Sequence, residues 1–210
     1  MPYVEAAVRR SQFIAAARTA LAAHGVAKTS LRVVAAQADV PLATMQYVFP
    51  SKEKLLRAVI EDVVDEIAGV LQDSAVTGQG LENAIRQGLE TFWTRLVRGG
   101  RELQLLQYEL TMYALRTPGN EDLARLQYQR YADVVAQWCR QAAERAGETA
   151  AVSFEHLARM IVAGVDGLIL QYVCDPDDAR AREGREALAN MTIGLARGGQ
   201  AVSANTGGPE

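Results

Sequence analysis

The sequence has few cysteines and few histidines, and this narrows the kinds of site it can build. Two cysteines, Cys139 and Cys174, are too few for a disulfide framework and are typical of a reducing compartment. The two histidines, His24 and His156, lack the Cys, His or carboxylate spacing of a zinc site. We therefore expect no metal site and no cofactor.

Long apolar runs and alternating strand patterns are also missing. The longest nearly apolar stretch, residues 160–170, contains Asp166 and is well short of the ~20 residues that span a bilayer. The first residues lack the extended apolar region of a signal peptide, so we expect a cytoplasmic protein with no membrane partner. The sequence has no phosphate-binding glycine motif after a predicted strand, and it shows no set of residues spaced for catalysis. We therefore expect that the protein is not an enzyme.

Charge is distributed unevenly along the 210 residues, whose net charge is -3. Residues 1–60 hold eight Lys or Arg and three acids, a net of +5, whereas the remainder carries -8. A basic head on an acidic body is expected of a module that binds a polyanion, joined to a domain that does not. A solvated surface of uneven charge would give the same counts.

Residues 29–57 have the pattern of two short helices joined by a tight turn, followed by the start of a third helix. Apolar residues recur at helical spacing in the first helix: Leu31, Val34, Ala35 and Ala38. Ser30 can cap this helix, Asp39 forms a turn, and Pro41 suits the first turn of the second helix. Ser51 then caps the third. This is the layout of a DNA-binding helix-turn-helix.

Over about residues 9–57 the chain resembles the TetR (tetracycline-repressor-like) family of bacterial transcriptional regulators. The resemblance rests on Gly25, Thr29, Ser30, Ala35, Ala38, Val40, residues 44–53, Leu55 and Leu56. The sequence departs from the family in having Pro41 and Ala43 where Ser and Gly are frequent, and Val48 where an aromatic residue is usual. The resemblance implies a ligand-responsive regulator, most often a repressor.

The expected fold is all-α, with an N-terminal three-helix helix-turn-helix head joined to a larger helical effector-binding and dimerisation domain. We place the DNA-binding domain at residues 1–50, the ligand-binding and dimerisation domain at 51–197, and a disordered tail at 198–210. Helical periodicity and glycine or proline punctuation predict the remaining helices at 9–23, 52–73, 81–98, 101–116, 120–146, 154–174 and 178–197.

DNA contacts are expected from the second helix of the motif, because the major groove shows each base pair a distinct pattern. Thr44 and Gln46 are the polar candidates for base reading, and Leu42 and Ala43 can pack on thymine methyl groups. Contacts to the phosphate backbone are expected from Thr29, Arg32, Tyr47 and Lys52, and Ser30 is also placed among the DNA-binding residues. Packing or capping within the head is the alternative role for Thr44 and Tyr47.

A small-molecule effector of unknown identity is expected in the body. Seven of the 13 aromatic residues lie between positions 92 and 138, although part of this set forms a stripe that a helix core also explains. Polar residues in apolar surroundings are sharper candidates, and Asp166 can equally bond a tyrosine. The predicted ligand residues are Trp93, Gln107, Tyr108, Thr111, Tyr131, Trp138 and Asp166.

One head contacts few phosphates, so two heads on a palindromic double-stranded DNA operator, and hence a homodimer, are expected. Residues 156–173 are apolar nearly all round, and the resemblance also implies dimerisation through the last two helices. The predicted interface residues are Leu157, Ile161, Gly164, Leu168, Tyr172, Leu188, Met191 and Leu195. Two alternatives are a helix buried centrally in one subunit and a dimeric helical adaptor whose head contacts protein.

Overall fold

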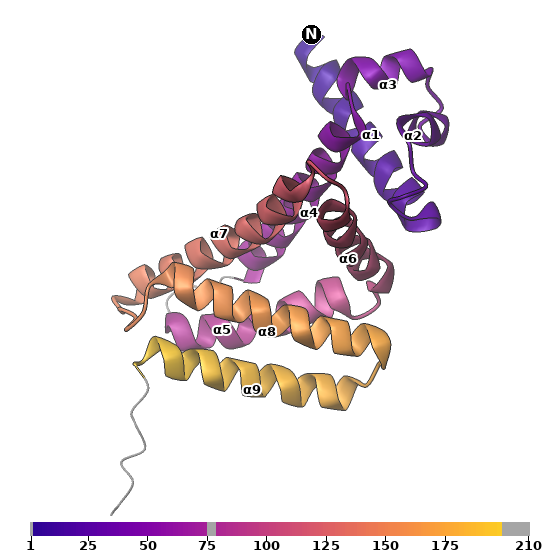
Figure 1. Cartoon of the computed structure of the whole chain (residues 1–210). Coiled ribbons are helices and arrows are strands. Elements are labelled where there is room, and N and C mark those ends of the chain that lie inside the picture. The colour runs from indigo at the N-terminus through magenta and orange to yellow at the C-terminus, as the bar shows by residue number, and fades with distance from the viewer. Residues whose placement is uncertain (1, 75–78, 199–210) are drawn as a thin grey trace, which may run out of the picture. The chain divides into compact units, whose positions relative to one another are not determined.

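The computed structural model describes residues 2–74 and 79–198, with side chains for residues 6–71 and 79–198 (Figure 1). Every regular element in these residues is a helix, which confirms the all-α prediction. The elements are α1 (Pro2–His24), α2 (Leu31–Gln37), α3 (Leu42–Val48), α4 (Lys52–Ser74), α5 (Gly80–Phe92), η1 (Trp93–Val97), α6 (Arg101–Arg116), α7 (Glu121–Ala146), α8 (Phe154–Cys174) and α9 (Asp178–Ala196). The predicted tail, residues 198–210, lies outside the described residues except for Gly198.

The chain forms two compact units. The first contains residues up to 70 together with 92–131, and the second contains 71–91 together with the chain from 132 onward. Helices α4 and α7 each run from one unit into the other. This division differs from the predicted domain boundaries, which stay a prediction.

Local capping explains where several helices begin and end. The Ser30 hydroxyl accepts a hydrogen bond from the Val33 N–H at 3.3 Å, as predicted for the start of α2. The Asp177 carboxylate accepts from the N–H groups of Ala179 and Arg180 at the start of α9. Gly25 follows α1 with φ +77°, the left-handed conformation that glycine adopts at helix ends.

Two helix boundaries differ from the sequence prediction. Helix α1 begins at Pro2, seven residues earlier than the predicted start at residue 9. The predicted helix 81–98 is divided into α5 and the π-helical turn η1, in which the Arg98 N–H donates to the Trp93 carbonyl at 2.8 Å. The Leu96 carbonyl in η1 accepts from the Gln104 side chain, a contact that periodicity within one helix does not reveal.

The helix-turn-helix is held by a shared apolar core. Phe13 and Leu21 of α1, Val34 of α2, Met45 of α3 and Phe49 after it are buried. Helix α2 packs against both α1 and α3. Because α2 and α3 are only seven residues each and short helices are marginal on their own, this packing supplies most of their stability.

In the second unit, α8 and α9 lie side by side and antiparallel (Figure 1). Each helix has a glycine against which a leucine of the other helix packs. Leu188 occupies the space that a Cβ on Gly164 would need, and Leu168 occupies the space that a Cβ on Gly184 would need. The opposite side of α9 is tied to α5 by three polar contacts: Arg197 to Glu82, Arg86 to Asn190, and Arg185 to Glu90. Both faces of α9 are therefore partly used within the chain.

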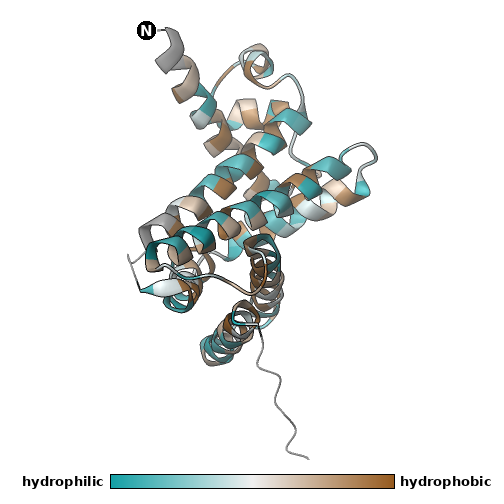
Figure 2. Ribbon diagram, turned by 90° about the vertical axis from the view of Figure 1, so that its left-hand side faces the viewer, coloured by the Kyte–Doolittle hydropathy of each residue, from teal (hydrophilic) through white to brown (hydrophobic). Residues whose placement is uncertain are grey.

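Helix α8 has more apolar surface than its packing within the chain buries. By length and composition it is the one helix among the described residues that could cross a membrane, a test that core helices of soluble proteins also pass. Only 28% of its most apolar 18-residue stretch is buried. Figure 2 shows that most helices carry both hydrophilic and hydrophobic residues.

Candidate nucleic-acid interface

The second helix of the motif, α3, presents one face to solvent and anchors the other. Met45 is fully buried, whereas Ala43, Gln46 and Tyr47 are exposed, with Tyr47 90% exposed. Leu42 and Thr44 are partly exposed. An aromatic side chain left so open on a helix with a buried anchor is available for contact with a partner.

The turn between α2 and α3 is tight and uses an unusual backbone conformation. Asp39 has φ +53°, in the left-handed region, and its N–H donates to the Ala36 carbonyl at 3.2 Å. The next N–H, that of Val40, donates to the Ala35 carbonyl at 3.0 Å. These bonds fix the direction in which α3 leaves the turn.

Two of the predicted phosphate contacts stay on the surface near the start of α2. Ser30 is exposed while its hydroxyl caps the helix, so its own O–H can still donate outward. Arg32 is also exposed in the first turn of α2. Together with the exposed face of α3, these residues keep the donors that a phosphate backbone requires.

Thr29, also predicted as a phosphate contact, has its side chain turned into the protein. Its side chain is only 3% exposed, and its hydroxyl donates to the Gly25 carbonyl at 2.8 Å and to the Ala20 carbonyl at 3.3 Å. The hydroxyl therefore closes the turn between α1 and α2 from inside. The sequence shows a hydroxyl near a helix start but not on which side of the turn it lies.

Lys52, also predicted as a phosphate contact, is engaged by protein groups in this structure. Its ammonium donates to the Val26 carbonyl at 2.6 Å and lies 4.6 Å from the centre of the Tyr113 ring. Burial lowers the pKa of Lys52, and the nearby Glu53 carboxylate opposes that effect more weakly. Lys52 thus points at protein groups of the first unit.

Three of the predicted ligand residues meet in the first unit. The Tyr131 hydroxyl donates to the Gln107 side chain at 2.7 Å, and the Thr111 hydroxyl donates to the Gln127 side chain at 3.2 Å. The Gln127 amide in turn donates to the Tyr131 hydroxyl at 3.1 Å. We call Gln104, Gln107, Thr111, Gln127 and Tyr131 the glutamine–tyrosine cluster.

Sequence reasoning missed two members of this cluster. Gln104 and Gln127 are each 2% exposed, which is unusual for glutamine and requires hydrogen-bond partners. Gln104 donates to the Leu96 carbonyl at 2.8 Å and accepts from Gln107 at 3.4 Å. The spacing of Gln104, Gln107 and Thr111 along one face of α6 was the available signal.

The other predicted ligand residues do not join the cluster. Trp93 is buried in η1, and Tyr108 is partly exposed on α6. Trp138 belongs to the second unit, where its ring lies 2.3 Å from the position of a Cβ on Gly88, so it is a core residue packed on α5. Asp166 is only half-buried, within α8.

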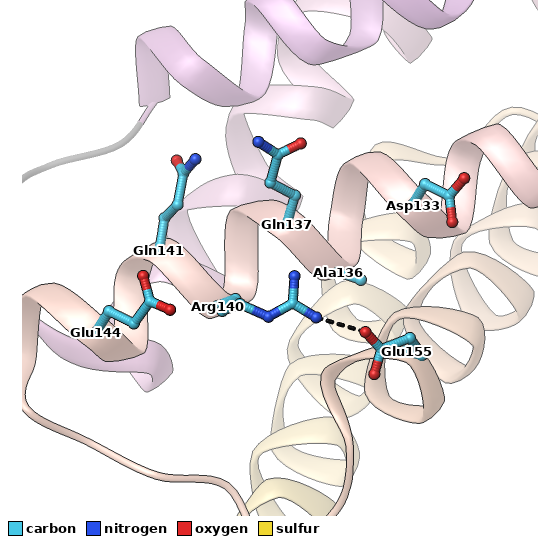
Figure 3. Close-up of a pocket in the computed structure, with 7 residues that line it drawn as sticks. All are labelled: Asp133, Ala136, Gln137, Arg140, Gln141, Glu144 and Glu155. Carbon is cyan, nitrogen blue, oxygen red and sulfur yellow. Dashed lines mark hydrogen bonds and ion pairs between the residues drawn. The ribbon is translucent and has the colours of Figure 1, made fainter.

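A separate cavity of about 420 Å³ lies in the second unit, along one face of α7 (Figure 3). Arg140 crosses it and pairs with Glu155 at the start of α8. The remaining lining residues are Asp133, Ala136, Gln137, Gln141 and Glu144. None of the predicted ligand residues lines this cavity, and its charged walls do not suit an apolar effector.

Most of the predicted dimer residues are at least partly buried inside the chain, and the interface itself stays a prediction. Leu157, Ile161 and Leu188 are buried, and Leu188 fills the space beside Gly164. Of the rest, Leu168, Tyr172 and Leu195 are partly exposed, and the Tyr172 hydroxyl donates to Asp178 at 3.0 Å. Because residues 156–173 are apolar nearly all round, periodicity does not distinguish the side that faces α9 from the side that is free.

The open face of this helix pair contains Met191 from the predicted set together with residues that were not predicted. Met191 is 71% exposed. On α8 the exposed stripe contains Met160, Ala163, Gly167 and Leu170. A Cβ on Gly167 or Gly194 would meet nothing within 4 Å. We call Met160, Ala163, Gly167, Leu170, Met191 and Gly194 the α8–α9 face.

Two family models match the chain over most of its length. Residues 13–59 match that of the tetR family of bacterial regulatory proteins, which covers the head. Residues 84–196 match that of the C-terminal region of BetI-type transcriptional repressors, which is more than half of the chain.

Individual relatives agree with these matches. The chain is 29% identical over 176 residues to the nicotine-responsive transcriptional repressor HdnoR of Paenarthrobacter nicotinovorans, covering 83% of this chain and 89% of the relative. It resembles the structure of the multidrug binding protein EbrR in complex with imidazole, with 27% identity, a TM-score of 0.65 and coverage of 87% and 94% of the two chains. A Rhodococcus sp. protein assigned to the TetR family has the same fold, with 20% identity, a TM-score of 0.74 and coverage of 90% and 98%. The chain therefore belongs to the TetR family of bacterial transcriptional regulators, which are DNA-binding proteins and not enzymes.

Proposed function

We propose that the protein is a ligand-responsive repressor that binds a palindromic DNA operator as a homodimer in the cytoplasm. The observation that carries this proposal is the outward face of α3, where Ala43, Gln46 and Tyr47 are exposed above the buried Met45. A helix of this kind can enter a major groove while its anchor holds it on the head. Repression is the activity of HdnoR, and the sense of regulation is carried over from it.

DNA contacts are assigned to the exposed members of the predicted set. Gln46 and Thr44 read bases, Leu42 and Ala43 pack on thymine methyl groups, and Tyr47 contacts the phosphate backbone. Ser30 and Arg32 add backbone contacts from the start of α2. Thr29 and Lys52 are left out because both point into the protein.

The test is a selection of bound sequences from a random duplex pool, followed by titration at two salt concentrations. We expect a palindromic consensus with half-sites one duplex turn apart, about 34–36 Å. Affinity should fall steeply with salt, since neutralised phosphates release counterions. Binding without sequence preference or salt dependence would contradict the proposal.

The homodimer is proposed to form through the α8–α9 face. Its exposed apolar side chains and open glycines allow close helix approach, and only 28% of the most apolar stretch of α8 is buried within the chain. Two copies would pack α8 and α9 into a four-helix bundle. This arrangement pairs two heads, as a palindromic operator requires.

The effector is proposed to be a small nitrogen heterocycle that binds at the glutamine–tyrosine cluster. Amide and phenol groups can donate to or accept from the nitrogen atoms of such rings, HdnoR is a nicotine-responsive repressor, and EbrR forms a complex with imidazole. Nicotine and imidazole are the probes. Either should raise Tm and release operator DNA, with Tyr131→Phe reducing both effects, because DNA and effector affinities are coupled reciprocally.

A further inference from the structure

The turn between α1 and α2 is held by side chains from outside the helix-turn-helix. The Val26 N–H donates to the Glu109 carboxylate of α6 at 3.0 Å, and the Val26 carbonyl accepts from Lys52 at the start of α4 at 2.6 Å. Val26 itself is only 2% exposed. Both backbone groups of one buried turn residue are thus satisfied by charged side chains, which form stronger hydrogen bonds than neutral groups do.

Helix α6 provides two of the groups that hold this turn. Glu109 and Tyr113 are four residues apart and so lie on the same side of the helix. The Tyr113 ring lies under the Lys52 ammonium at 4.6 Å, a distance typical of a cation–π contact. We call Glu109, Tyr113, Lys52 and Val26 the turn bracket.

Gly25 makes this close approach possible. The Glu109 carboxylate oxygens lie 3.2 Å from where a Cβ on Gly25 would be, and Gly25 has φ +77°. A side chain at this position would crowd the carboxylate and strain the backbone. The Gly25 carbonyl also accepts from Thr29, directly before the Ser30 cap of α2. The bracket therefore acts on the residues from which α2 begins.

The same helix carries the glutamine–tyrosine cluster. Gln104, Gln107 and Thr111 of α6 bond to α7 and η1, whereas Glu109 and Tyr113 bond to the turn bracket. Glu109 and Tyr113 also lie outside residues 13–59, the part of the chain that matches the head. Because Glu109 contacts Val26 and Tyr113 contacts Lys52, a movement of α6 would displace the groups that hold the turn.

We propose that Glu109 and Tyr113 are positioning residues for DNA recognition: they hold the α1–α2 turn and engage Lys52, so that α2 and α3 keep the orientation that reads DNA. Lys52 then acts through Val26 and not through a phosphate. This inference rests on the proposed function and specifies which side chains outside the helix-turn-helix set its geometry.

The experiment compares Glu109→Ala with Glu109→Gln and with Glu102→Ala, a control for an exposed glutamate on the same helix. Operator affinity is measured on the selected duplex, and hydrogen exchange of the Val26 amide is measured without DNA. Glu109→Ala should weaken operator binding about tenfold, with the ranking of base variants unchanged, and should accelerate Val26 exchange. Glu109→Gln keeps a hydrogen-bond acceptor and should restore most of the operator affinity and most of the Val26 protection. Glu102→Ala should change neither the affinity nor the exchange rate.

Lys52→Met separates positioning from a phosphate contact. A positioning lysine should weaken binding while the salt slope stays that of the wild type, whereas a slope reduced by about one would assign Lys52 to a phosphate and overturn the proposal. Tyr113→Leu, which keeps an apolar contact, should weaken operator binding about threefold. It is the test variant if Glu109→Ala does not fold.

Wild-type affinity and wild-type Val26 exchange in Glu109→Ala would also overturn the proposal. If the wild-type protein binds no duplex, the proposed function fails. The exchange measurement still decides whether the bracket holds the turn, since it does not depend on DNA.

Discussion

Asp39 is the only non-glycine residue with positive φ in the part of the chain that the structure describes. Aspartate tolerates the left-handed region better than most residues, and a β-branched side chain does not. Asp39→Val should therefore lower the free energy of unfolding by about 1–2 kcal/mol, whereas Asp39→Gly should leave it unchanged or slightly higher. Urea unfolding of the two variants measures this, and equal stability of Asp39→Val and wild type would contradict it.

The two cysteines should differ sharply in reactivity. Burial raises the pKa of Cys139 to about 12, and Cys174 is exposed. Because the thiolate is the reactive species, iodoacetamide at about pH 8 should modify Cys174 in the folded protein and reach Cys139 only on unfolding. Mass spectrometry of the alkylated peptides distinguishes the two sites, and equal labelling rates would refute the assignment.

The same shift has a defined effect on stability. The pKa of Cys139 in the folded state lies above the ordinary thiol value of 9.0, so the folded protein binds the thiol proton more tightly. The stabilisation from this group is intact below about pH 9 and is lost as the pH rises toward 12. Cys139→Ser would replace this thiol by a hydroxyl that needs a hydrogen-bond partner in the same buried position.

At the scale of elements, α3 is the helix whose exposed face should determine specificity. Gln46→Ala removes a side chain that can bond adenine through two hydrogen bonds, so discrimination at one base pair should fall by about 1–3 kcal/mol. Gln37→Ala, at an exposed glutamine on α2, is the matched control and should leave the ranking of operators unchanged. Competition binding with single-base operator variants is the measurement. An unchanged ranking in Gln46→Ala would remove Gln46 from base reading.

The helices themselves were largely predictable because their signals are local. Gly25 ends α1, Ser30 caps α2 and Ser51 caps α4, each as the sequence indicates. The π-helical turn η1 was not predictable, because the Leu96 carbonyl is satisfied by Gln104 from the following helix. Contacts between helices decide such features, and a pattern read along one helix does not contain them.

The site was predictable only in part for the same reason. The exposed face of α3 follows from where its apolar anchor Met45 lies. Lys52 and Thr29 carry the residue types of phosphate contacts, but their bonds to the α1–α2 turn depend on tertiary packing. The prediction for α8 was incomplete for a different reason. Because the helix is apolar on nearly every side, its sequence does not show that Gly164 faces α9 while Gly167 is open.

For the whole molecule, the oligomeric state controls how many heads reach one operator. One head alone provides few phosphate contacts, and exposed apolar area on α8 and α9 is costly unless a partner covers it. Both requirements are met by the same contact between two copies. Dimerisation and operator binding should therefore be lost together when the α8–α9 face is disrupted.

Met191→Asp tests this at the most exposed apolar residue of that face. A carboxylate placed between two apolar helix pairs loses its water without gaining a partner, so the dimer dissociation constant should rise at least about a hundredfold. Leu115→Asp, at a 57% exposed leucine on α6, is the control and should leave the dimer intact. Analytical ultracentrifugation gives the oligomeric state, and operator titration of the same samples gives the affinity. A Met191→Asp protein that remains dimeric would place the interface elsewhere, whereas a monomer with full operator affinity would break the link between pairing of heads and recognition.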